Sequence, residues 1–163
     1  MPQSKMIHIV KRHFEFSFSM LEKMIDQCPE DLWGAKNGGF VFWQQLVHAF
    51  TGLHFWMRRE NNGFSEPFSD KKVFPELDGE PDCFLSKEEV AVYKDAVKKI
   101  WQQFFEGRED DWLLLESVIY GKITNMDVVF MQIRHMQYHA GHCNSILRDK
   151  GREAVAWVDY LAE

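Results

Sequence analysis

The sequence of 163 residues contains few cysteines, and they lie far apart. Cys28, Cys83 and Cys143 are the three, and no pair of them has the CxxC spacing. Small secreted domains that depend on disulfides carry an even number of closely spaced cysteines. We therefore expect no disulfide framework and favour a reducing compartment, the cytoplasm. Residues 1–10 also lack the apolar segment of a secretory signal peptide, so we expect none.

Clusters of basic residues are also absent. The chain has 19 Lys and Arg against 25 Asp and Glu, which gives a net charge of −6. Proteins that bind nucleic acids need clustered Lys and Arg to displace counterions from phosphates. We therefore expect no nucleic-acid partner.

One uncharged segment, residues 37–57, is long enough for a membrane-spanning helix. Polar side chains and a glycine pair interrupt it, at Gln44, Gln45, His48, His54 and residues 38–39. We therefore expect a buried helix entered through a glycine turn, and no membrane partner.

Apolar residues are plentiful and periodic. They make up 45% of the chain, which at this length suits one domain with a sizeable core, so we expect a single domain over residues 1–163. Steps of three and four residues between apolar positions predict long helices. The four predicted helices span about residues 4–27, 40–59, 87–106 and 125–150. Because no alternating strand pattern occurs, we predict an all-α bundle.

Local signals mark the ends of these predicted helices. Pro29, Gly107 and Gly151 follow three of them as stop signals. Ser86 and Glu89 have the spacing of a capping box at the start of the third helix. Thr124 or Asn125 can cap the fourth. The pattern of residues 112–123 does not decide between helix and extended chain, and we expect the tail, residues 154–160, to pack on the bundle with Trp157.

A long connector separates the second and third predicted helices. Pro67, Pro75 and Pro81 prevent a continuous helix over residues 61–85. Loops of this length are uncommon in compact domains and are often functional. Its phenylalanines either fix the loop on the core, which we favour, or cover a pocket; they are Phe64, Phe68, Phe74 and Phe84.

The seven histidines are the unusual feature of the composition. His135, His139 and His142 are spaced i, i+4 and i+7, so they share one face of the fourth helix. That face is apolar and directs them inward; it also carries Val128, Met131, Tyr138 and Ile146. Two imidazoles one helical turn apart can hold a single cation, and a third ligand must then come from another helix.

The neighbours of this pair have simpler interpretations. We expect His142 to pack against the helix or to hydrogen-bond a metal-bound group, and Cys143 to be a buried reduced thiol. His135 and His139 have the spacing of a metalloprotease motif, but the next residue is Met136, not the glutamate that such enzymes use as a base. Metalloprotease activity is therefore disfavoured.

The remaining histidines lie on the first two predicted helices. His8 and His13 are off the main apolar stripe, so we interpret both as surface or boundary residues. Periodicity mildly prefers His54 to His48 as an inward residue of the second helix. His48, however, shares its side with Gln44, Gln45 and Thr51, which resemble the surroundings of a site.

Two short motifs resemble the DinB/YfiT-like metal-binding superfamily. Residues 43–48 (WQQLVH) are similar to its tryptophan followed by a helical turn and a histidine. Residues 135–142 (HMQYHAGH) resemble its run of His, three residues, His, any residue and Gly. A Leu-Arg pair at 147–148 and Gly151 follow as in the family, and Trp157 stands where members often place a tryptophan. The chain departs from the pattern at Met136, where the family often has a glutamate.

The resemblance implies an up-down-down-up four-helix bundle and a homodimer. It also implies a metal held by His48, His135 and His139, and thereby favours His48 over His54. Imidazole ligands discriminate weakly among Zn²⁺, Ni²⁺, Fe²⁺ and Mn²⁺. Three such ligands leave an open position for water, a small-molecule substrate or a thiol.

Two functions follow from this resemblance. The first is a metal-dependent enzyme, either a thiol S-transferase or a hydrolase, since some relatives use low-molecular-weight thiols. The alternative is non-catalytic binding of a metal or small ligand, or a stress-related structural bundle. No catalytic residue is assigned from the sequence, although Tyr138 and His142 are candidates for a general base.

Overall fold

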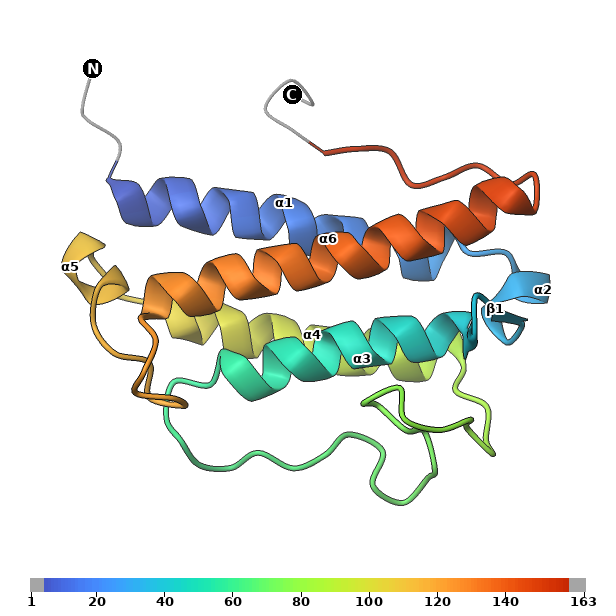
Figure 1. Cartoon of the computed structure of the whole chain (residues 1–163), viewed down its shortest axis with the longest axis horizontal. Coiled ribbons are helices and arrows are strands. Elements are labelled where there is room, and N and C mark those ends of the chain that lie inside the picture. Colours follow the sequence, from blue (N-terminus) through green and yellow to red (C-terminus); the bar gives the residue numbers. More distant parts are fainter. Residues whose placement is uncertain (1–4, 159–163) are drawn as a thin grey trace.

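Four long helices lie side by side along the long axis of the molecule in the computed structural model, which describes residues 5–158 (Figure 1). They are α1 (Met6–Gln27), α3 (Phe42–Trp56), α4 (Lys87–Phe105) and α6 (Asn125–Asp149). Helix α1 packs on α4 and α6, and α3 packs on the same two helices. The prediction of a mainly helical protein is confirmed. Ser4, where the first helix was predicted to begin, lies outside the described residues.

The segment between α1 and α3 contains short elements that periodicity did not reveal. Helix α2 (Glu30–Trp33) is followed by an antiparallel hairpin of β1 (Lys36–Asn37) and β2 (Phe40–Val41). Gly38 and Gly39 form its turn with φ of 62° and 97°, a region that glycine adopts without strain. The expected glycine turn is therefore present, but α3 begins at Phe42 because Phe40 and Val41 belong to a strand.

The core fills the space between the four long helices. All six apolar residues of the predicted stripe on α1 are buried, namely Ile7, Val10, Phe14, Phe18, Leu21 and Ile25. Trp33 and Trp43 are also fully enclosed, and the Nε1 of Trp33 donates to the carbonyl oxygen of Leu85. Trp33 thereby joins the segment before α3 to the residues before α4.

Helix ends follow the predicted signals closely. Ser86 and Glu89 form a capping box at α4, and Thr124 forms one with Asp127 at α6. Gly107 and Gly151 each follow a helix with φ of 67°. Within the described residues, no helix combines the length and apolar character needed to cross a membrane.

The segments before and after α6 test the predictions for residues 112–123 and for the tail. Helix α5 covers only Asp110–Leu113, and an antiparallel bridge between Glu116 and Thr124 closes the irregular chain after it. The tail packs on α6 through Val155, whose backbone N–H and C=O pair with the side chain of Asn144. Trp157 is 68% exposed, so the prediction that it packs on the bundle is wrong. Tyr160 lies outside the described residues.

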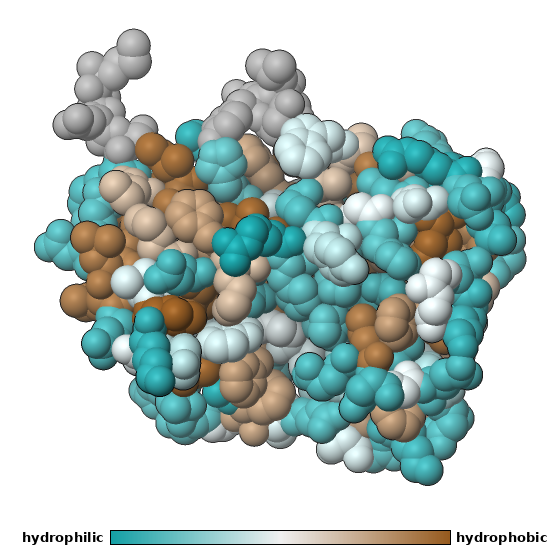
Figure 2. All heavy atoms as spheres, in the orientation of Figure 1, coloured by the Kyte–Doolittle hydropathy of each residue, from teal (hydrophilic) through white to brown (hydrophobic). Residues whose placement is uncertain are grey.

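Apolar residues gather on the surface at the end of the molecule where α5 lies (Figure 2). The exposed ones that follow α5 are Leu114, Leu115, Val118 and Tyr120.

Candidate metal centre

Three histidines meet between α3 and α6. His48 comes from α3, and His135 and His139 come from adjacent turns of α6. Each can offer one ring nitrogen, and these three atoms lie within 4.8 Å of one another. The Nε2 atoms of His48 and His135 are 2.9 Å apart. His135 and His139 of α6 are therefore joined by His48 of α3, the histidine that the resemblance favoured over His54.

Hydrogen bonds on the far side of two rings set their tautomers. Nδ1 of His48 lies 2.7 Å from the carbonyl oxygen of Pro75, and Nδ1 of His139 lies 2.8 Å from Oε1 of Gln45. Both oxygens are acceptors, so each Nδ1 carries the proton and each Nε2 keeps a free lone pair. This arrangement is typical of metal-ligating histidines.

The third ring is positioned by a close approach of the two helices. His135 lies against Gly52 of α3, where an added Cβ would come within 2.7 Å of Cε1 and 2.9 Å of Nδ1. Real Cβ atoms do not come this close to a ring, so a residue with a side chain would displace His135. Gly52 therefore makes room for the imidazole.

Burial keeps His135 and His139 uncharged at neutral pH. Burial and the neighbouring His48 lower the pKa of His135 from 6.5 to about 4. Burial and the other rings lower the pKa of His139 from 6.5 to about 3. Neutral imidazole is the form that binds a metal ion, so both side chains are in the ligating state.

These residues fit a divalent cation. Two nitrogen ligands on a tetrahedral zinc ion are about 3.3 Å apart, given metal–nitrogen distances of about 2.05 Å. The separation of 2.9 Å between His48 and His135 is close to that value. Because His48 carries its proton on Nδ1, the Nε2–H of His135 can donate to Nε2 of His48, and a bound cation would take the place of that proton.

A tight turn from the α3–α4 connector supports His48. We call residues 73–79 the anchored turn. The buried Nε2 of Gln44 donates to the carbonyl oxygens of Val73, Phe74 and Gly79 at 3.2, 3.1 and 2.9 Å. Phe74 and Leu77 have positive φ of 50° and 60°, which costs energy for residues with side chains. The turn presents the Pro75 carbonyl to His48, so the connector contributes directly to the cluster.

A cavity of about 480 Å³ opens beside the cluster, and we call it the histidine cavity. His48 and His135 form part of its wall, together with Glu76 of the anchored turn. Most of the remaining wall is apolar, from Phe55, Trp56 and Met131. The connector therefore both packs on the core, through buried Pro67, Val73 and Pro75, and lines a cavity. Phe84 does not pack in this way, because 59% of it is exposed.

The other histidines stay outside the cluster. His8 and His13 are exposed, as predicted. His54 is half-buried, and its Nδ1 lies 3.2 Å from the hydroxyl of Tyr93. His142 packs against Gly38 of the hairpin turn, and its buried Nε2 has no hydrogen-bond partner among the described residues.

Three further predictions concern residues near the cluster. Tyr138 was placed on the inward face of α6, but it is 71% exposed, so that placement is wrong; only its ring edge touches His139. Cys143 is a free and fully buried thiol, as expected, and burial raises its pKa. Met136 is fully buried in the core, so the position after the first histidine does not face the site.

Sequence reasoning missed the roles of Gly52 and Pro75, and it recognised Gln44 and Gln45 only as polar neighbours of His48. A signal for the glutamines was present, because two adjacent amides inside an almost entirely apolar helix need buried partners. No comparable signal marks Pro75, whose role depends on the path of a long connector.

Comparison with known proteins gives one match. The sequence pattern of the DinB family matches residues 1–163. No curated protein and no solved structure matches the chain.

Proposed function

The chain belongs to the DinB family, and on that premise we propose that it binds one divalent metal ion through His48, His135 and His139. The observation that carries this proposal is the convergence of three imidazole nitrogens within 4.8 Å, two of them with a tautomer suited to ligation. A metal ion bound there would supply Lewis acidity beside the histidine cavity. Zn²⁺, Ni²⁺, Fe²⁺ and Mn²⁺ all suit imidazole ligands.

We further propose that the metal-loaded protein is an enzyme that transfers a low-molecular-weight thiol or hydrolyses a small-molecule substrate. Three protein ligands leave at least one position open, which is the layout of catalytic metal sites. The histidine cavity borders two of the three ligands and has an apolar wall that suits an organic substrate. No catalytic base is assigned, since Tyr138 is exposed and His142 is outside the cluster.

The second candidate is non-catalytic binding of a metal or small ligand, including a stress-related structural bundle. It is supported by the position of the cluster, which lies between α3 and α6 and would tie the two helices together. On this alternative, metal removal lowers the melting temperature and no substrate turns over with any metal. Turnover of thiols and electrophiles only after metal loading favours the enzyme.

The same family assignment supports proposals about architecture and assembly. We propose that the four long helices run up-down-down-up within one domain over residues 1–163. The long connector at residues 57–86 supports this order, because parallel neighbouring helices need a crossover along the bundle. We also propose a homodimer, supported by the apolar surface after α5, and light scattering during size-exclusion chromatography measures it.

Elemental analysis of the purified protein tests the metal proposal. We expect about one metal ion per chain in the wild type and none in the double variant His135→Ala, His139→Ala. His54→Ala and His142→Ala are matched controls, because they remove histidines from the same two helices outside the cluster. Full metal content in the double variant, or equal loss in the controls, contradicts the assignment.

A further inference from the structure

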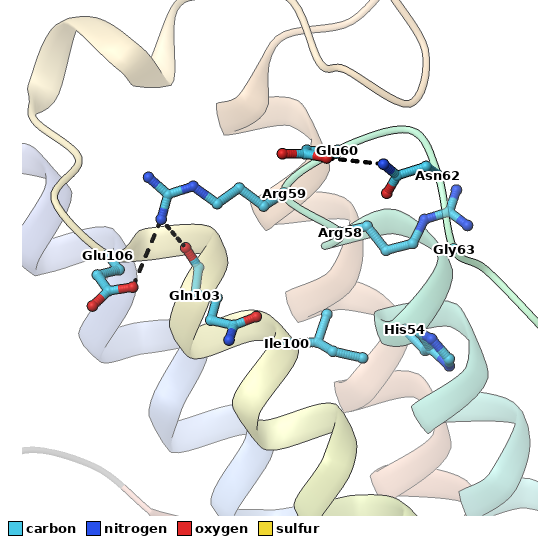
Figure 3. Close-up of a pocket in the computed structure, with 9 residues that line it drawn as sticks. All are labelled: His54, Arg58, Arg59, Glu60, Asn62, Gly63, Ile100, Gln103 and Glu106. Carbon is cyan, nitrogen blue, oxygen red and sulfur yellow. Dashed lines mark hydrogen bonds and ion pairs between the residues drawn. The ribbon is translucent and has the colours of Figure 1, made fainter.

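A second cavity of about 500 Å³ lies where α3 and α4 end, apart from the histidine cluster (Figure 3). We call it the arginine cavity. Arg58 and Arg59 border it from the chain just after α3, and their side chains extend in opposite directions. Ile100 and Gln103 of α4 form the facing wall. Two adjacent arginines at a cavity are unexpected in a chain with a net charge of −6.

Arg58 is held in place but lacks a partner for its charge. Its guanidinium lies over the rings of Phe55 and Phe64, 4.9 and 5.1 Å from their centroids. Its one hydrogen bond is long, 3.5 Å from Nη2 to Oδ1 of Asn61. Nε is buried without a partner, and no carboxylate of residues 5–158 forms an ion pair with this side chain. Burial lowers the pKa of Arg58, which indicates that its charge is partly desolvated.

A partly desolvated guanidinium without a counter-ion is costly, and an anion would offset that cost. Contact with two aromatic rings also restricts the guanidinium before any ligand arrives. A pre-positioned fork of N–H groups matches the paired oxygens of a carboxylate or a phosphate.

The guanidinium of Arg59 is a second positive charge at the cavity, and its contacts with neighbouring residues are weak. Its Nη1 donates to the carbonyl oxygen of Gln103 at 3.3 Å and lies 3.7 Å from Oε2 of Glu106. The side chain of Glu106 is 73% exposed, and exposed ion pairs of this kind contribute little. Glu106 therefore offsets little of the positive charge that Arg59 adds to the cavity.

The acidic residues at the rim do not cancel this preference. Glu60 is exposed and accepts a hydrogen bond from Nδ2 of Asn62 at 2.8 Å, while Glu106 faces solvent beside Arg59. Solvent and salt screen both carboxylates, whereas burial leaves Arg58 less screened. The nearest histidine, His54, is held neutral by burial and by Arg58, which lower its pKa.

We propose that the arginine cavity binds the oxyanion group of a small organic ligand, a carboxylate or a phosphate. Arg58 is the contact for the oxyanion, Arg59 adds positive charge at the opposite side of the cavity, and Ile100 provides an apolar wall for the rest of the ligand. This site requires no metal and stands independently of the histidine cluster.

Titration with inorganic phosphate in a phosphate-free buffer tests the proposal on the full chain. We expect saturable binding in the millimolar range, measured by calorimetry and by the NMR signal of the Arg58 Nε–H. Arg58→Gln should weaken binding at least about tenfold, since it removes the charge-assisted contacts. Arg58→Lys, which keeps the charge but loses the fork, should also weaken it and covers the case in which Arg58→Gln does not fold.

Arg148→Gln is the matched control, because Arg148 is exposed on α6 and does not line the cavity. It should leave phosphate binding unchanged. Equal weakening by Arg148→Gln overturns the proposal, because it would indicate a general charge effect. Acetate in place of phosphate separates carboxylate from phosphate recognition, and saturable binding of neither ion refutes the site.

Discussion

Nδ1 of His139 donates a hydrogen bond of 2.8 Å to Oε1 of Gln45, and both side chains are almost completely buried. The bond joins α6 to α3 and orients the imidazole so that Nε2 faces His48 and His135. Gln45 therefore belongs to the proposed metal site without being a ligand.

Replacing Gln45 by leucine should lower metal affinity by about 10- to 100-fold, the usual cost of losing the partner of a ligating histidine. The ring of His139 would lose its fixed tautomer while its nitrogen remained available. Competition with a chromogenic chelator measures the affinity. Gln102→Leu, an exposed glutamine of α4, is the control, and equal affinities for both variants would contradict the role of Gln45.

Gln44→Ala should loosen the anchored turn. The variant loses three hydrogen bonds to the carbonyls of residues 73, 74 and 79, and we expect a free energy of unfolding lower by about 1–3 kcal/mol. Hydrogen exchange should become faster in residues 73–79, and metal affinity should fall because His48 loses its fixed acceptor. Urea unfolding and exchange mass spectrometry give the two measurements. Unchanged protection of the turn would show that other contacts hold it.

Substitution by alanine should have opposite effects at two helical glycines, Gly52 and Gly141. Gly52→Ala brings a Cβ within 2.7 Å of the His135 ring, so the ring must move and metal affinity should fall at least about tenfold. Gly141→Ala, on exposed α6 surface with nothing within 4 Å of the new Cβ, should stabilise the protein by about 0.5–1 kcal/mol. Chelator competition and thermal unfolding distinguish the two. Similar behaviour of both variants would refute the close approach at Gly52.

Acid should destabilise the metal-free protein through the histidine cluster. His135 and His139 have a pKa of about 4 and about 3 when folded, against 6.5 as the ordinary value. Below pH 6.5 the unfolded chain therefore binds protons that the folded chain does not. The free energy of unfolding consequently decreases as the pH is lowered. The loss continues through pH 4 toward pH 3, and above pH 6.5 the two groups contribute no pH dependence.

Urea unfolding of the metal-free protein between pH 7 and pH 4 measures this effect. His135→Gln should flatten the decline, because the amide does not titrate, while carboxylates contribute equally to both proteins. A parallel decline in the two proteins would contradict the lowered pKa of His135.

Local patterns in the sequence predicted most of the helical framework. The stripe of α1, the capping box at Ser86 and the glycines after α4 and α6 each depend on neighbouring residues alone. Periodicity failed where the chain leaves a regular element, as at Phe40 in the hairpin and Trp157 in the tail. Tyr138 failed for a different reason: it was placed on the inward face of α6 with the histidines, but its side chain is 71% exposed.

The histidine cluster required information beyond periodicity. Spacing on one helix identified His135 and His139, but the choice of His48 over His54 came from a resemblance, because periodicity mildly favoured His54. The structure shows the physical difference between them. His48 has a carbonyl acceptor behind it and two rings in front, whereas His54 meets Tyr93 and lies at the arginine cavity. The partners of His48 come from residues 27 to 91 positions away along the chain, which no local pattern encodes.

Gly52 lies four residues after His48, so the proposed ligand and the space for the ring of His135 are on the same face of one helix. That coincidence provides a search signature: a histidine and a glycine at i, i+4 on one helix, paired with two histidines at i, i+4 on a later one. Chains that keep the three histidines but carry a bulky residue at the glycine position must separate the two helices or shift the ring. Such a search would sort relatives by the geometry of their site before any of them is purified.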